Sequence, residues 1–229
     1  MLLSATELAV IGLSLKVATV AVLASLPFGI AMGWLLARKR FPGKALLDAL
    51  VHLPLVLPPV VIGYMLLVGF GNQGMFGKAF AAVGIEFAFR WTGAALACAL
   101  MGFPLLVRAI RLSIDATDRR LEQAAATLGA PPWRVFLGIT LPLAWPGIVA
   151  GAILAFAKAL GEFGATITFV SSIPGETRTI ASEIWTLMQS PGGEAAIWRL
   201  AAVSVALSLG ALLISEWLVR RQRGRDVAE

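Results

Sequence analysis

Five apolar stretches, each long enough to cross a lipid bilayer, dominate this sequence. A helix needs about 20 residues to span the hydrocarbon core of a bilayer, and stretches of that kind recur along the whole chain. Of 229 residues, 59% are hydrophobic and 14% are charged, whereas soluble domains are typically ~45–50% apolar and ~25% charged. We therefore predict an all-α membrane helical bundle with five spans. These are residues 17–37, after an amphipathic lead-in over 6–16, then 49–70, 91–107, 143–170 and 200–219.

The rarest residue types exclude several kinds of chemistry. A single cysteine, Cys98, permits no internal disulfide. With only one histidine, His52, the chain cannot build a His/Cys zinc cluster. The net charge of +6 reflects Arg and Lys near the ends of the apolar stretches, which is typical of membrane proteins. We therefore expect contact with a lipid bilayer, no metal site and no nucleic-acid partner.

The charge of the connections alternates along the chain. Residues 38–48, 108–134 and 220–225 are rich in Arg and Lys, whereas residues 71–90 and 171–199 carry both signs. Basic connections stay on the cytoplasmic side of a membrane. The alternation therefore predicts an odd number of spans, with the N-terminus outside and the C-terminus in the cytoplasm. We expect one transmembrane domain, residues 8–219, followed by a basic cytoplasmic tail, residues 220–229.

The long outer connection contains a segment with helical periodicity. Residues 179–189 place Ile180, Ile184, Leu187 and Met188 on one face of a short helix. Two interpretations stay open for this segment. It is either an extracytoplasmic lid or docking surface, or a helix that rests on the bundle at the membrane interface.

The basic connection over residues 114–142 is too structured to be a simple linker. Asp118 can cap the N-terminus of a helix that starts at residue 119. Leu121, Ala125 and Leu128 then recur at helical spacing and form one narrow apolar stripe. Gly129 suits a left-handed C-terminal cap, and two prolines prevent continuation. The pattern predicts a capped helix over about residues 119–129, and so short a helix should pack against a partner.

This segment resembles the EAA motif of ABC-importer permeases. The resemblance rests on Gln123-Ala124-Ala125, on Gly129 and on Ile139-Thr140-Leu141-Pro142. It implies a coupling helix that docks on a cytoplasmic ATPase subunit. Gln123 stands where the family has a glutamate, while Glu122 lies one residue earlier. The coupling residues implied are Leu121, Glu122, Gln123, Ala124, Ala125, Leu128, Gly129, Ile139, Leu141 and Pro142. The other reading is a capped cytoplasmic helix without a coupling role.

Three further segments, residues 53–64, 161–166 and 173–179, are similar to the molybdate permeases and more loosely to the sulfate permeases. The likeness implies the fold of a type I importer in the cell (inner) membrane, with two permease chains forming a homodimer. It also implies two cytoplasmic ABC ATPase subunits and an extracytoplasmic oxyanion-binding protein. The cargo would be molybdate or tungstate, moved by alternating access. A sulfate-type permease of the same family and a secondary transporter are the alternatives.

The energy source is expected on another chain. The sequence contains no G-x-x-x-x-G-K-S/T loop of the kind that cradles nucleotide phosphates. We therefore expect a non-catalytic subunit that binds no cofactor, with ATP and Mg²⁺ held by the partner ATPase.

Charged and helix-breaking residues inside the spans mark a candidate translocation pathway. Lys158 and Glu162 lie one turn apart, with Thr166 a further turn along. Charges within a membrane usually face a protein interior or an aqueous cavity. Pathway or gate candidates are therefore Pro54, Pro58, Pro59, Lys158, Glu162 and Thr166. The alternatives are an ion pair with a purely structural role and a merely bent packing helix.

Overall fold

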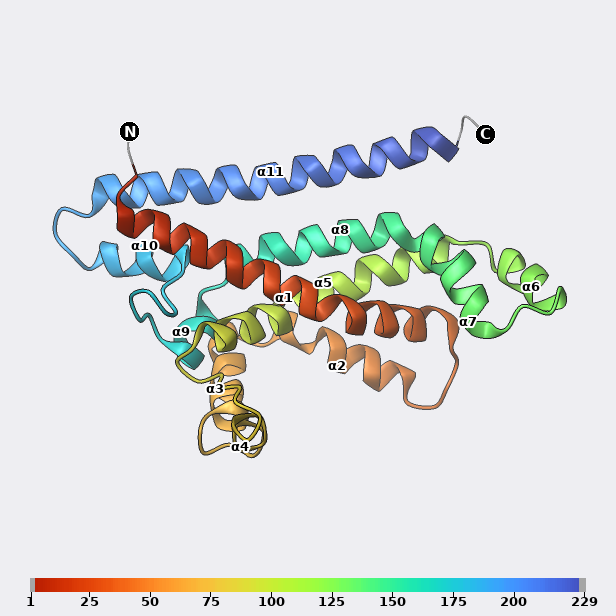
Figure 1. Ribbon diagram of the computed structural model, residues 1–229, viewed down its shortest axis with the longest axis horizontal. Helices are drawn as coiled ribbons and strands as arrows, with labels where there is room; N and C mark the ends of the chain where they lie inside the picture. The colour runs from red at the N-terminus through yellow and green to blue at the C-terminus, as the bar shows by residue number, and fades with distance from the viewer. Residues whose placement is uncertain (1–2, 227–229) are drawn as a thin grey trace.

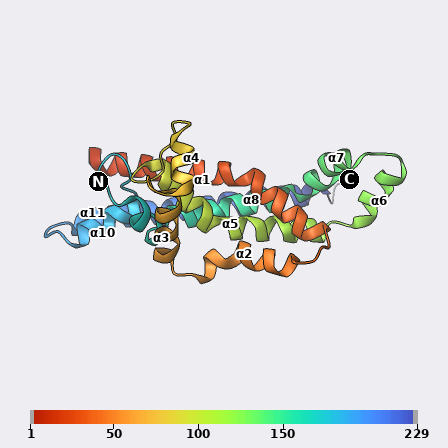
Figure 2. The ribbon, with the colours of Figure 1, turned by 90° about the horizontal axis from the view of Figure 1, so that it is seen from below.

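The computed structural model describes residues 3–226, which fold into an elongated bundle of helices with no strand among them (Figures 1 and 2). The prediction of an all-α bundle is confirmed. In chain order the elements are α1 (Ala5–Arg38), α2 (Lys44–Val56), α3 (Pro59–Phe70), α4 (Met75–Ala81), α5 (Trp91–Ala116), α6 (Arg119–Thr127), α7 (Pro132–Val135), the π-helical turn η1 (Phe136–Thr140), α8 (Leu141–Leu160), α9 (Gly164–Val170), α10 (Ile180–Met188) and α11 (Glu194–Asp226).

Four helical segments among the described residues are long and apolar enough to cross a membrane. They begin at Ala5, Trp91, Pro132 and Glu194, and the bent pair α2 and α3 supplies a fifth if it counts as one span. Two helices are longer than the spans predicted on them. Ser4 and Glu7 form a capping box that starts α1, so the lead-in over 6–16 and the first span are one continuous helix. The helix of the third span continues beyond residue 107 to Ala116.

Helices α1, α5 and α8 form the centre of the bundle. Glycines at their contacts let the backbones approach closely, as is common between membrane helices. A Cβ atom on Gly33 would lie 2.8 Å from Ile110 of α5, and one on Gly147 would lie 2.8 Å from the carbonyl oxygen of Ala109. Fully buried apolar side chains such as Leu106 fill the remaining space.

The second predicted span is sharply bent. α2 ends at Val56, α3 begins at Pro59, and the bend between them is 111°. Pro58 and Pro59 are consecutive and have no N–H to bond the carbonyls of Pro54 and Leu55, which favours a break at this point. Pro54 lies inside α2, so only two of the three predicted prolines interrupt the span.

The fourth predicted span, residues 143–170, is not one helix. α8 ends at Leu160 and α9 begins at Gly164. The carboxylate of Glu162, between them, accepts a hydrogen bond of 3.0 Å from the backbone N–H of Ala165. A carboxylate at this place satisfies a free donor and the positive end of the α9 dipole. The hydropathy of residues 143–170 predicted one continuous span here, and the break is a finding of the structure.

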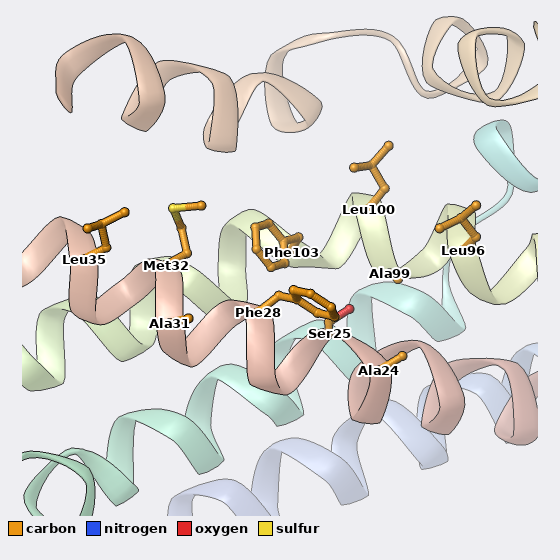
Figure 3. Close-up of a pocket in the computed structure, with 10 residues that line it drawn as sticks. All are labelled: Ala24, Ser25, Phe28, Ala31, Met32, Leu35, Leu96, Ala99, Leu100 and Phe103. Atoms are coloured by element: carbon orange, nitrogen blue, oxygen red, sulfur yellow. The ribbon is translucent and has the colours of Figure 1, made fainter. Parts of the chain in front are cut away.

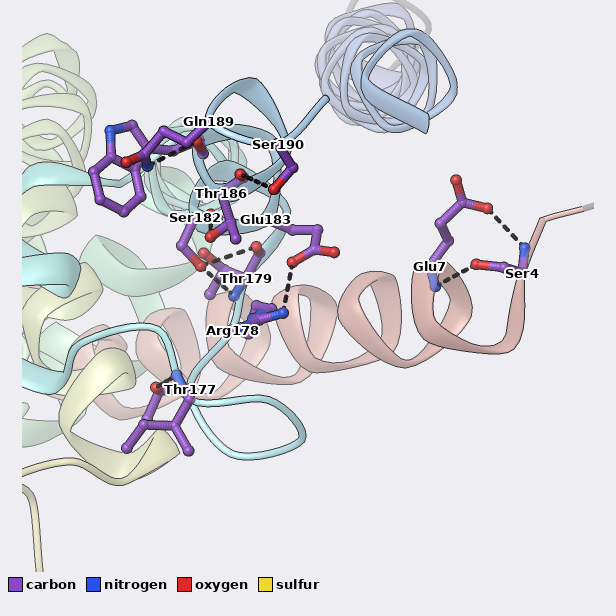
Figure 4. Close-up of polar contacts among 12 residues, drawn as sticks. Ser4, Glu7, Thr177, Arg178, Thr179, Ser182, Glu183, Thr186, Gln189 and Ser190 are labelled. Carbon is purple, nitrogen blue, oxygen red and sulfur yellow. Dashed lines mark hydrogen bonds and ion pairs between the residues drawn. The ribbon is translucent and has the colours of Figure 1, made fainter. Parts of the chain in front are cut away.

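Helix α10 is fixed to the bundle. Thr179 and Ser182 form a capping box at its start, and Arg178 pairs with Glu183 at 3.1 Å (Figure 4). The backbone N–H of Ile180 donates to the hydroxyl of Ser14 in α1 at 2.8 Å. These contacts favour the reading of a helix that rests on the bundle. Of the predicted apolar face, Met188 points away and is exposed.

The start of α1 and the end of α11 lie toward opposite ends of the long axis, as an odd number of crossings requires (Figure 1). The ends of α1, α5 and α11 share one end of the bundle with α6, and α10 lies near the other. The basic connections therefore gather at one end. Part of the predicted tail is helical, since α11 continues to Asp226.

Candidate functional site

Helix α6 lies beyond the end of the bundle and is capped at both ends as predicted (Figure 1). The Asp118 carboxylate accepts a hydrogen bond of 2.9 Å from the N–H of Arg120. At the other end, Gly129 has φ +85°, the left-handed conformation that favours glycine. The N–H of Gly129 bonds the carbonyl of Ala126 at 3.0 Å, and the N–H of Ala130 bonds that of Ala125 at 3.1 Å. This is a Schellman cap, which ends α6 at Thr127 rather than at residue 129.

Two of the three residues of the predicted apolar stripe are left uncovered by this chain. Leu128 is 88% exposed and Leu121 is 50% exposed, whereas Ala125 is half-buried. Ala124, beside them, is also exposed. A leucine that solvent surrounds contributes nothing to the stability of the monomer. The stripe is therefore a free surface on a rigid, capped helix.

The opposite side of α6 is held by polar contacts. The Glu122 carboxylate accepts hydrogen bonds from Arg38 Nε at 3.0 Å and from Thr140 Oγ1 at 2.8 Å. Arg119 donates to the carbonyl of Ala37 at 2.9 Å. Gln123, in the position of the motif glutamate, is exposed. Ile139 and Leu141 are half-buried and Pro142 is exposed, at the junction of η1 and α8.

The charged pair inside the fourth span is formed. Lys158 Nζ donates to Glu162 Oε2 at 2.5 Å, and the Glu162 side chain is buried while that of Lys158 is about one-third exposed. Thr166, predicted to follow them along one helix, instead belongs to α9 and donates to the carbonyl of Phe163 at 2.9 Å. Its hydroxyl therefore satisfies a backbone carbonyl at the break between α8 and α9.

The two helix breaks lie against each other. A Cβ atom on Gly164, the first residue of α9, would lie 2.8 Å from Pro59, the first residue of α3. Further along the same contact, a Cβ on Gly63 would lie 2.5 Å from the carbonyl oxygen of Ala165. Of the predicted pathway residues, Pro59 lies against this tightly packed α3–α9 pair, and Glu162 and Thr166 lie at the break before α9. Pro54 is buried, and Pro58 and Pro59 are exposed.

A cavity of about 570 Å³ lies elsewhere, between α1 and α5 (Figure 3). Its lining is apolar apart from Ser25, whose hydroxyl donates to the carbonyl of Ala21. An oxyanion needs several hydrogen-bond donors in its site. The lining of this cavity therefore offers no oxyanion site of its own.

Comparison with known proteins identifies the family. Residues 25–224 match the family described as "Binding-protein-dependent transport system inner membrane component". The chain belongs to this family. It is 61% identical to the "Molybdenum transport system permease protein ModB" of Escherichia coli (strain K12), over 98% of this chain and 99% of that one. It is 38% identical to the "Sulfate transport system permease protein CysT" of the same organism, over 87% and 72%.

Solved structures agree on the fold. A bacterial alginate ABC transporter, crystallised in complex with a periplasmic protein bound to an alginate pentasaccharide, contains a chain with a TM-score of 0.74 and 16% identity. The match covers 95% of this chain and 80% of that chain. The fold is that of an ABC-importer membrane subunit, and the chain is a multi-pass component of the inner membrane.

Two residues that hold α6 escaped the sequence analysis. In the sequence, Arg38 is one of several basic residues after the first span, and Thr140 is a variable position within the motif Ile139-Thr140-Leu141-Pro142. Their partner Glu122 lies 84 residues from Arg38 along the chain. No local periodicity signals a contact over that separation.

Proposed function

We propose that this chain is the permease subunit of an ATP-driven molybdate importer. The near full-length likeness to a molybdenum permease, at 61% against 38% for the sulfate permease, supports molybdate as the cargo. Tungstate, a tetrahedral dianion of the same kind, is the expected competitor. The observation that best supports the importer mechanism is the capped helix α6, at which Leu121 and Leu128 are exposed to solvent.

The partner of α6 is proposed to be a cytoplasmic ABC ATPase subunit, which binds ATP and Mg²⁺ on a separate chain. An apolar helical face that fits a groove is a common recognition mode. Docking there requires the basic end of the bundle to lie in the cytoplasm, which agrees with the distribution of Arg and Lys. The N-terminus and α10 then lie outside, on the side from which an extracytoplasmic oxyanion-binding protein would deliver its cargo.

A second copy of the chain is proposed to cover α3. The face of α3 opposite α9 is an exposed stripe of Val60, Val61, Tyr64, Met65 and Val68. Lipid could cover the aliphatic side chains, but it offers no donors to the carbonyls freed at the nearby bend and no partner for a tyrosine hydroxyl. Protein or water must therefore lie here. Two copies about a two-fold axis would place protein against this face and enclose a polar, hydrated path between them.

The pair Lys158–Glu162 is proposed to face that path. A bare charge in hydrocarbon costs on the order of tens of kcal/mol, so a dianion needs a polar route. Glu162 neutralises Lys158, and a nearly neutral site lets an anion pass without trapping it. The partial exposure of Lys158 leaves its ammonium group within reach of such a path.

Replacing Lys158 by methionine tests the pathway assignment. We expect the Lys158→Met variant to import molybdate about ten-fold more slowly, because the buried Glu162 carboxylate loses its partner and repels the anion. Uptake into vesicles at matched amounts of assembled complex measures the effect. Uptake equal to that of the wild type would remove Lys158 from the pathway.

Reconstitution tests the function itself. Vesicles containing this chain and its ATPase, supplied with the binding protein, should take up labelled molybdate only when ATP is present. Unlabelled tungstate should compete, and sulfate at the same concentration should not. Uptake without the ATPase would indicate a secondary transporter, and full competition by sulfate would indicate a sulfate-type permease.

A further inference from the structure

Three elements far apart in the sequence meet at the carboxylate of Glu122. α6 supplies the carboxylate, the last turn of α1 supplies Arg38, and the last residue of η1 supplies Thr140. Both donors bind the same oxygen, Oε1, at 3.0 and 2.8 Å. Arg38 also donates through Nη2 to the carbonyl of Thr117, just before α6, at 3.2 Å.

This joint, defined as Arg38, Glu122 and Thr140, is largely shielded from water. The Arg38 side chain is 7% exposed, that of Glu122 is 18% exposed, and Thr140 is buried. Water screens a shielded pair less than a surface pair, so removing one partner leaves an uncompensated charge. The joint is therefore a stiff connection, unlike an exposed ion pair.

The joint and the docking stripe occupy different sides of α6. Leu121 and Leu128 point to solvent, whereas Glu122 points back to α1 and η1. The exposed neighbour Gln123 takes the position of the motif glutamate. The carboxylate of this helix is thus directed into the chain itself and away from the surface that a partner would contact.

We propose that Glu122 is a positioning residue that transmits movement from α6 to α1 and α8. This inference rests on the proposed function, because it supposes that an ATPase subunit moves α6. The joint then carries that displacement to the cytoplasmic end of α1 and, through Thr140, to the start of α8. At its far end α8 carries Lys158, so one stiff element connects the docking helix with the proposed path.

The π-helical turn η1 supports this role. The N–H of Leu141 bonds the carbonyl of Phe136, five residues earlier. Such a turn contains one more residue than an α-helical turn and is frequent at functional sites. It ends at Thr140, which contacts Glu122. The contact is thus made at the junction where an irregular turn gives way to a regular span.

The test compares import with hydrolysis in the reconstituted complex. The Glu122→Gln and Arg38→Gln variants should each lower the molybdate imported per ATP hydrolysed by about ten-fold. The double variant should lose no more than either single one, since all three lack the same contact. Asp115→Asn, which removes a carboxylate from the more exposed ion pair with Arg111 on α5, is the matched control and should stay within about two-fold of the wild type. Co-purification of the ATPase should persist in every variant.

Either of two results with the Glu122→Gln variant would overturn the proposal. Unchanged import per ATP in Glu122→Gln would mean that the joint transmits nothing. Loss of ATPase binding in that variant would place Glu122 in the docking surface instead. If Glu122→Gln does not assemble, Thr140→Val removes one hydroxyl contact and should lower the ratio about three-fold; no change there also overturns it. A wild-type complex that imports no molybdate with ATP would contradict the proposed function instead.

Discussion

The Gly63→Ala variant is expected to melt roughly 5–10 °C below the wild type, because a single added methyl group would force α3 away from α9. The new Cβ would lie 2.5 Å from the carbonyl oxygen of Ala165 and 2.8 Å from Thr168 Cβ. The first of these is a backbone atom, so no side-chain rotation relieves the clash. Separation of α3 and α9 would open the contact between the two helix breaks.

The chain carries its own probe for this measurement. Cys98 is the single cysteine and is buried, so a thiol-reactive dye reports unfolding of the purified protein. Gly210→Ala in α11 is the matched control, since nothing lies within 4 Å of its added Cβ. Alanine is favoured over glycine in a helix, so this control should melt at or above the wild-type temperature. Equal melting of both variants would contradict the close packing of α3 on α9.

The Leu128→Glu variant should bind the ATPase subunit about 30-fold more weakly, because it places a charge at the centre of the proposed apolar contact. Leu128 is 88% exposed in this chain. The substitution therefore disturbs no packing of the permease itself, and its melting temperature should stay unchanged. Binding of the detergent-purified permease to the isolated ATPase measures the effect, with molybdate uptake falling in parallel.

Leu128→Met is the control for this surface. Methionine keeps a long apolar side chain at the same place, so binding should stay within about three-fold of the wild type. Wild-type affinity in Leu128→Glu would show that the ATPase docks elsewhere. Weak binding in both variants would show that shape alone decides the contact.

The features confirmed from sequence are local ones. The two caps of α6 follow from Asp118 and Gly129, which act on backbone groups within a few residues. The ion pair between Lys158 and Glu162 follows from their spacing of four residues. The approximate positions of the apolar segments follow in the same way, because hydropathy is a property of each segment alone; four of them are single helical segments and the bent pair α2 and α3 is the fifth if it counts as one span.

The break between α8 and α9 was not predicted, although Glu162 itself had been singled out. Its carboxylate was assigned to Lys158 alone, whereas it also caps α9 through the N–H of Ala165. The choice between continuing and breaking a helix depends here on α3, which packs against α9. The packing energy between α3 and α9 arises only when both helices are in place.

Composition, charge distribution and short-range spacing were enough to establish a membrane bundle with a capped helix at its basic end. Tertiary structure alone decided how that helix is held and which helices meet at the breaks. Arg38, Glu122 and Thr140 come from three separate elements, and Gly63 of α3 meets Ala165 and Thr168 of α9. Contacts of this kind depend on the relative placement of whole helices, and each helix is compatible with many placements until all of them pack together.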